Sequence, residues 1–172
     1  HRVDRRQRQM CIRDRDDTGL KLIKQLQVSA DLSLAELSRR VGISKTACWN
    51  RMQKMEEEGI VLGKQVLFDR NSLGLKIVVF LSITVGRHST DWVEKFTEVI
   101  EKFPEIVEVH RLTGEGADYQ LKVVCPSIEL YDLFQQNLIS KIDFTSMSTK
   151  MSLKQLKDTS LLPLSHLETL SD

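Results

Sequence analysis

The sequence of 172 residues predicts an α+β protein with an N-terminal three-helix, helix-turn-helix domain followed by a ferredoxin-like βαββαβ sandwich. Apolar residues recur at helical spacing through residues 17–60, where a glycine separates two short capped helices. Beyond residue 75 the pattern changes to the order strand, helix, strand, strand, helix, strand. A doubled βαβ unit of this order predicts a four-stranded antiparallel sheet with both helices on one face.

Residues 16–62 are expected to form the helical domain, with a first helix from about residue 17 to 28. Ser33 and Glu36 form a capping-box pattern at the start of the second helix. Gly42 ends that helix, because glycine takes the left-handed conformation that a sharp turn requires. These signals together predict a tight corner before the third helix.

The third helix carries an outer face that is unusual for a solvated helix. Cys48, Met52 and Met55 fall on one side and predict the buried face. The other side holds short polar groups and an exposed indole, which can read base edges in a DNA major groove. A helix corner that contacts no nucleic acid is the alternative, and there Arg51 would pair with Glu36 or one of Glu56 to Glu58 instead of a phosphate. The candidate DNA-binding residues are Ser44, Lys45, Thr46, Trp49, Asn50, Arg51 and Gln53.

Residues 63–74 are expected to be a linker that contains one strand, KQVLFD (64–69). The sheet domain is expected over residues 75–165 and a tail over 166–172. Its first strand, residues 75–85, is largely apolar on both sides. One sheet face would pack the helices, and the other needs a second cover, most simply another copy of the chain. Further strands are expected at 106–113, 119–125 and about 144–153. One helix is expected to begin near Asp91, where Glu94 completes a capping box, and another near Ser127.

The hairpin loop TGEGADYQL (113–121) is the second candidate site. Its two glycines let a backbone approach a ligand closely, and Glu115 or Asp118 could hold a cationic group such as an α-ammonium. The alternative is an ordinary polar turn. Composition alone does not separate the two.

Composition excludes several classes of function. Three cysteines lie far apart, fit no zinc spacing and predict no disulfide framework, which points to a reducing, cytoplasmic location. No metal signature, phosphate loop or cofactor motif is present. The longest apolar stretch, residues 77–85, is too short to span a bilayer, and no signal peptide is visible.

Charge is distributed unevenly along the chain. Residues 1–15 hold six arginines against two aspartates, whereas residues 76–172 hold ten basic against fourteen acidic residues. The body therefore lacks the basic footprint of a tight DNA binder, and two or more copies acting together would compensate. Residues 1–15 have no apolar period. We expect a disordered or foreign segment there, with a basic arm that follows DNA as the alternative.

The whole arrangement resembles the Lrp/AsnC family of feast/famine regulators, from residue 16 to about 165. The segment LSLAELSRRVGIS with the K-x-x-C-x-x-R-M spacing after it is similar to the family's reader segment. TGEGADYQLKV (113–123) resembles its ligand-loop motif, and LKDTSLLPL (156–164) resembles its tail. Leu73-Gly74 matches the usual entry into the second domain. The loop is one residue longer than the commonest form.

The resemblance implies a transcriptional regulator that binds double-stranded DNA and is not an enzyme. It further implies that the sheet domain dimerises, that dimers assemble into rings, often octamers, and that an amino acid binds between dimers. Gly114 and Asp118 match the loop positions that shape the pocket, and Thr145 to Ser148 would face it. The candidate effector-binding residues are Gly114, Glu115, Asp118, Gln120, Thr145 and Ser148.

Two other functions remain open at this point. Siroheme decarboxylases share the architecture, and His110 with Arg111 would be the residues facing such a substrate. A regulator without an effector, in which the sheet domain only assembles chains, is the other.

Overall fold

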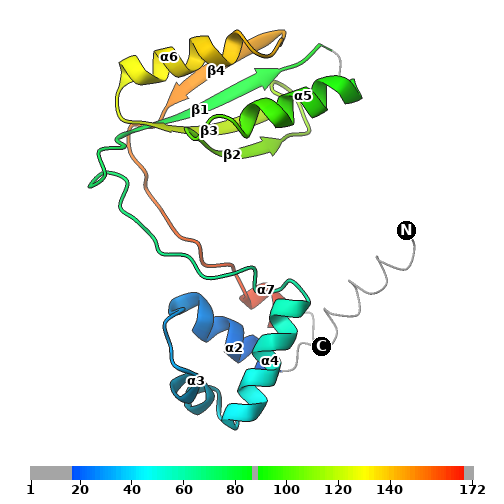
Figure 1. Cartoon of the computed structure of the whole chain (residues 1–172), viewed down its shortest axis with the longest axis vertical. Coiled ribbons are helices and arrows are strands. Elements are labelled where there is room, and N and C mark those ends of the chain that lie inside the picture. The colour runs from blue at the N-terminus through cyan, green and yellow to red at the C-terminus, as the bar shows by residue number, and fades with distance from the viewer. Residues whose placement is uncertain (1–16, 87–88, 169–172) are drawn as a thin grey trace. The chain divides into compact units, whose positions relative to one another are not determined.

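The computed structural model describes residues 17–86 and 89–168, so the predicted segment 1–15 lies outside the described residues (Figure 1). The described chain divides into two compact units. One is helical and extends to residue 66, and the other contains the sheet and spans residues 67–156. Residues from 157 onward belong to the helical unit. This differs from the predicted boundary at residue 165, because the end of the chain packs on helices that are distant in sequence.

The helical unit contains α2 (Asp17–Val28), α3 (Leu34–Val41) and α4 (Lys45–Glu57), as predicted. The Ser33 hydroxyl accepts a hydrogen bond from the Glu36 backbone N–H at 3.2 Å, which caps α3. Gly42 takes the left-handed conformation with φ 78°, and its N–H donates to the Ser38 carbonyl. Without a Cβ, glycine enters this conformation at little cost, so the chain turns sharply into α4.

A small apolar core joins the three helices. Leu22, Leu37, Cys48 and Met55 are buried in it, with one or two contributed by each helix. The positions of Cys48 and Met55 confirm which side of α4 faces inward. Burial of these side chains is what holds helices this short, since isolated helices of their length are marginal in water.

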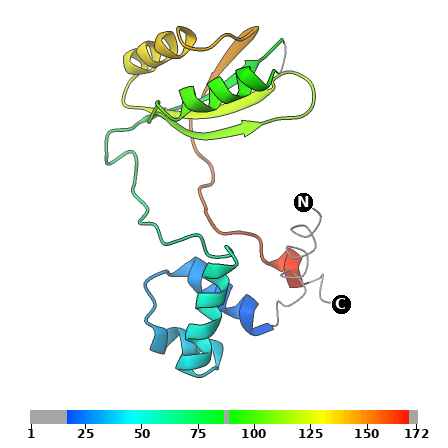
Figure 2. The same cartoon turned by 45° about the vertical axis from the view of Figure 1, so that its right-hand side comes forward.

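The sheet unit has the predicted βαββαβ order. Both helices cover one side of a four-stranded antiparallel sheet with strand order β2-β3-β1-β4 (Figures 1 and 2). This confirms the ferredoxin-like topology. Its elements are β1 (Ile77–Thr84), α5 (Thr90–Ile100), β2 (Ile106–Arg111), β3 (Tyr119–Cys125), α6 (Ile128–Ile139) and β4 (Ser146–Met151).

The main core lies between the sheet and the two helices. Alternate residues of β1 and β3 are buried there against α5 and α6. The opposite face is more polar than the predicted apolar surface, because it holds Ser82 and an ion pair between Lys122 and Glu108 next to Phe80. The prediction of a largely apolar outer face was therefore too general, since it considered one strand without its neighbours.

Two local predictions were wrong. Residues 64–69 form no strand, and Phe68 is 75% exposed, because the extended segment has no neighbouring strand to complete a ladder. Helix α5 is capped by Ser89, whose hydroxyl accepts from the Trp92 N–H at 3.2 Å, and not by Asp91. Asp91 lies inside the first turn, where its charge favours the helix N-terminus instead.

The end of the described chain returns to the helical unit. Leu164 is buried, and a short helix, α7 (Ser165–Glu168), follows it. Among the described residues, no helix is both long and apolar enough to cross a membrane.

Candidate functional site

The outer side of α4 is the first candidate site. Trp49 is 51% exposed, whereas Cys48 beside it is completely buried. Lys45, Thr46 and Asn50 are also exposed on this side. The exposed groups include an indole, an amide, a hydroxyl and an ammonium, which is a chemically mixed surface with donors and acceptors of the kind that contact base edges and phosphates.

Three of the predicted DNA-binding residues are in a different situation. The Ser44 hydroxyl accepts from the Ala47 N–H at 3.1 Å and so caps α4. The Gln53 amide donates to Glu56 at 3.3 Å, and Arg51 is only half-exposed. The exposed candidate DNA-binding groups are therefore concentrated in the first two turns of α4.

Glu36, one of the glutamates expected as alternative partners of Arg51, pairs with two other arginines. Its carboxylate accepts from Arg39 at 2.7 Å and from Arg40 at 2.8 Å. These two guanidinium groups lower the pKa of Glu36 to about 2, with the hydrogen bond from Arg39 as the largest cause. Glu36 therefore stays charged across the physiological range and neutralises part of the positive charge of α3.

The second candidate site is the hairpin loop between β2 and β3. One carboxylate oxygen of Asp118 accepts from the Val85 backbone N–H at 2.6 Å, and the Asp118 N–H donates to the Ile83 carbonyl at 2.9 Å. The Thr84 hydroxyl donates to the Gly116 carbonyl at 2.8 Å. The loop is thus attached to the end of β1 at several points, with Asp118 at the centre.

Glycine is required at two positions of this loop. Gly114 has φ 123° and Gly116 has φ 106°, values that residues with a side chain rarely adopt. No heavy atom lies within 4 Å of where a Cβ would stand on either glycine. The backbone shape, and not a shortage of space, therefore accounts for both glycines.

The last strand approaches the same place. Thr145, just before β4, donates its N–H to the Thr84 carbonyl at 2.8 Å. A Cβ on Gly86 would come within 3.0 Å of the Thr145 hydroxyl oxygen, so these two residues are in close contact. The structure therefore brings Asp118 and Thr145 to the same end of β1. Sequence reasoning missed Thr84, Val85 and Gly86. The only feature of the sequence that marks them is their position at the end of the most apolar strand.

Gln120 and Ser148 lie apart from the loop cluster. Both are opposite Ser82 in the sheet register, one on β3 and the other on β4, on the face away from the helices. The Ser82 hydroxyl donates to the side-chain carbonyl oxygen of Gln120 at 3.4 Å. The Gln120 amide nitrogen is buried and has no hydrogen-bond partner among the described residues. A buried amide donor of this kind favours an additional acceptor at this face.

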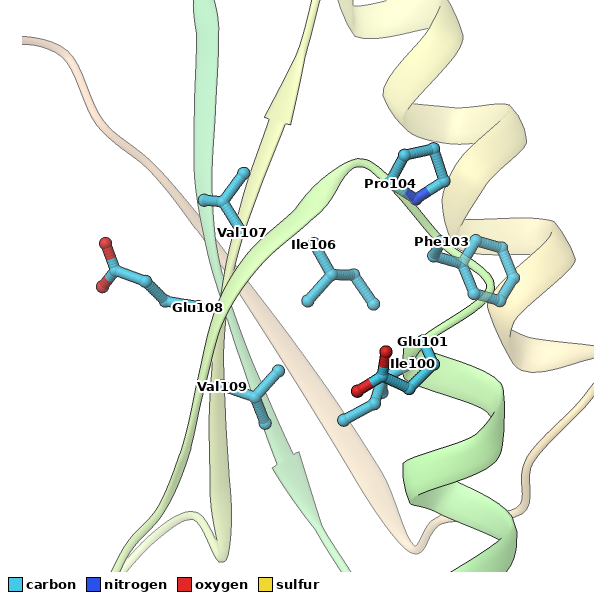
Figure 3. A pocket seen from close by; sticks show the side chains of 8 residues that line it. All are labelled: Ile100, Glu101, Phe103, Pro104, Ile106, Val107, Glu108 and Val109. Atoms are coloured by element: carbon cyan, nitrogen blue, oxygen red, sulfur yellow. The ribbon is translucent and has the colours of Figure 1, made fainter. Parts of the chain in front are cut away.

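Two cavities of the sheet unit lie away from the loop cluster. Figure 3 shows one of about 360 Å³ between the end of α5 and β2, lined by Ile100, Ile106 and Val109 among others. A second, of about 450 Å³, lies between the turn before β2 and α6. None of the predicted effector-binding residues lines either cavity.

No metal-binding cluster is found among residues 17–86 and 89–168. Cys48 and Cys125 are free and buried, and burial raises the pKa of both thiols. His110 is exposed and stands 3.7 Å from Glu108. The two cysteines are therefore core residues, and His110 is a surface residue.

Two family models cover most of the chain. Residues 15–61 match the model described as winged helix-turn-helix DNA-binding, and residues 78–162 match the Lrp/AsnC ligand binding domain. The division agrees with the two sites described above, since α4 lies in the first region and the hairpin loop in the second.

Known proteins match over nearly the same length. The glutamate uptake regulatory protein of Zymomonas mobilis is 37% identical over 153 residues, which cover 89% of this chain and 93% of that protein. An AsnC family transcriptional regulator from Agrobacterium tumefaciens superposes with a TM-score of 0.83 at 40% identity, covering 88% of this chain and 98% of that one. A transcriptional regulator of Neisseria meningitidis, solved as a complex with L-Met, superposes with a TM-score of 0.82 at 31% identity and covers the same shares. These relatives are regulators and not enzymes, which decides against the decarboxylase alternative. The chain belongs to the Lrp/AsnC family of DNA-binding transcriptional regulators.

Proposed function

We propose that this regulator reads DNA with the first two turns of α4 and responds to an amino acid through the hairpin loop of its sheet unit. The exposed indole and amide of Trp49 and Asn50 carry the first half of the proposal, because they stand beside Lys45 and Thr46 on a helix whose other side is buried. Trp49 and Asn50 contact base edges, and Lys45 contacts a phosphate. Arg51, Gln53 and Ser44 support the helix and the nearby backbone contacts.

Selection from a random duplex library tests the DNA-binding half. The enriched sequence is expected to contain two related half-sites, about 34 Å or a multiple of that distance apart, because a dimer presents two copies of α4. Asn50→Ala and Trp49→Ala each weaken binding to that sequence by about 1–3 kcal/mol. Glu57→Gln, a change at the acidic end of the same helix, is the matched control and leaves sequence preference unaltered. If all of the variants discriminate between DNA sequences as well as the parent does, α4 is not the element that reads the sequence.

An α-amino acid is the effector that the loop cluster fits best. Its ammonium group would meet the carboxylates of Glu115 and Asp118, and the backbone at Gly114 and Gly116 can approach it closely. Thr145 supplies a hydroxyl group beside the loop, whereas Ser148 and Gln120 lie further along the sheet, on the face away from the helices. The bound L-Met of the Neisseria regulator and the glutamate-related name of the Zymomonas protein are consistent with this class of ligand.

The exposed residues of the loop cluster also support assembly. Gly114, Glu115 and Thr145 are exposed in a single chain, and a neighbouring copy would cover them. The exposed Phe80 and the unpaired segment 64–69 are the surfaces that we assign to a homodimer, with further assembly to a ring such as an octamer. The buried, free thiols fit a reducing compartment, and we assign the cytoplasm as the place of action.

A thermal-shift panel of the twenty amino acids, run beside light scattering, tests the effector half. A true effector raises the unfolding midpoint through selective binding to the native state, and its removal lowers it again. A panel without any shift, together with intact DNA binding, would favour a regulator without an effector. A strictly monomeric protein at all concentrations would contradict the assembly.

A further inference from the structure

The chain beyond β4 connects the sheet unit with the helical unit a second time. The Ser152 N–H donates to the Val78 carbonyl at 2.9 Å, which is the last backbone hydrogen bond that β4 makes with β1. Leu153 is 99% exposed after it, and Leu156 is 87% exposed. The segment that follows the sheet is therefore a solvated connector and not part of either core.

This connector ends in a specific attachment to α2. The Leu162 N–H donates a hydrogen bond to the Gln27 side-chain carbonyl at 2.7 Å. In return, the Gln27 side-chain amide donates to the Leu162 backbone carbonyl at 3.4 Å. Leu164, two residues later, is only 8% exposed. One glutamine thus holds both backbone groups of a single residue, and a buried leucine reinforces the attachment.

The attached tail leads directly from the proposed effector site. Thr145 lies just before β4 and Ser148 within it, and the tail is the continuation of that strand. From Ser152 to Leu162 the chain spans at most about 35 Å, because an extended residue advances by no more than about 3.5 Å. The linker from Val61 to Ile77 spans up to about 55 Å by the same rule. The tail is therefore the shorter connection, but its attachment to α2 is non-covalent and depends on the Gln27 hydrogen bonds and on buried Leu164.

We propose that Gln27 is a positioning residue, which anchors the tail on α2 so that a change at the effector site reaches the DNA-binding unit through β4. A released tail would leave only the longer linker, and a movement of β4 would no longer act on α2. The coupling arises because the two states of the effector site differ in where they hold the anchored tail. This inference rests on the proposed function, since it requires both DNA binding and an amino-acid response.

Gln27→Leu tests the anchor, because it removes the amide and keeps a side chain of similar size. Gln25→Leu is the matched control on the same helix, where it removes a 3.2 Å hydrogen bond from Arg40 without touching the tail. Leu164→Ala weakens the attachment from the side of the tail. Affinity for the selected duplex is measured for the whole chain and each variant, with and without an equimolar mixture of the twenty amino acids. Hydrogen exchange of the peptide around Leu162 is measured in parallel.

The parent and Gln25→Leu are expected to change their DNA affinity by at least about fivefold on addition of the mixture. Gln27→Leu and Leu164→Ala are expected to bind DNA like the parent without amino acids, to respond less than about twofold, and to exchange faster around Leu162. A purely structural role would instead weaken DNA binding in both conditions and leave the ratio intact. An equal response in Gln27→Leu and the parent overturns the inference while leaving the proposed function in place. A parent that shows no response overturns the effector half of the proposed function, and the inference with it.

Discussion

Replacement of Asp118 tests the effector loop most directly, because its carboxylate accepts from the Val85 N–H at 2.6 Å. Asp118→Ala leaves this half-buried donor without its partner, which costs about 1–3 kcal/mol. Asp118→Asn keeps an acceptor but loses the charge. Since charged hydrogen bonds are about twice as strong as neutral ones, we expect the asparagine variant to lose about 1 kcal/mol.

Urea unfolding of the sheet unit, followed by near-ultraviolet circular dichroism, measures these losses. The expected order of stability is parent, then Asp118→Asn, then Asp118→Ala, with the slope against urea unchanged. Calorimetry with the effector found in the amino-acid panel should show weaker binding in both variants, whereas affinity for the selected duplex without effector stays the same. Equal stability and equal amino-acid affinity in parent and Asp118→Ala would refute both the structural and the binding role of this carboxylate.

Three further predictions concern the helical unit. The pKa of Glu36, about 2 in the folded chain, lies below its usual unfolded value of about 4.3, so its stabilising contribution is complete above about pH 4.3 and is lost as the pH falls toward 2. Glu36→Gln should remove this part of the pH dependence of stability, as measured by acid titration at low salt. An identical acid transition in parent and variant would contradict this. Leu37→Ala should destabilise the unit by about 2–5 kcal/mol in thermal unfolding, because it empties a buried position; a loss below 1 kcal/mol would mean that the core closes around the gap. Cys48 should react with a thiol reagent only when the unit opens, since it is buried and its pKa is raised by burial; a labelling rate like that of free cysteine would show that the core is not closed there.

Local sequence signals determined the elements and their order. Ser33, Gly42 and Ser127 act through their own backbone and that of the next few residues, so their roles as caps or turns could be predicted without the fold. The buried side of α4 followed from the spacing of Cys48 and Met55. Helical and strand periods extend over many residues, which makes them robust to a single exception.

Only the tertiary structure decided which residues meet. The contacts of Asp118 with Val85 and of Gln27 with Leu162 join positions 33 and 135 residues apart, and no local pattern encodes them. The strand predicted at 64–69 failed for the same reason, because a ladder needs a partner that alternation within one segment cannot provide. Sequence periodicity specifies which face of an element is buried, whereas the pairing of distant elements depends on how all of those faces pack together.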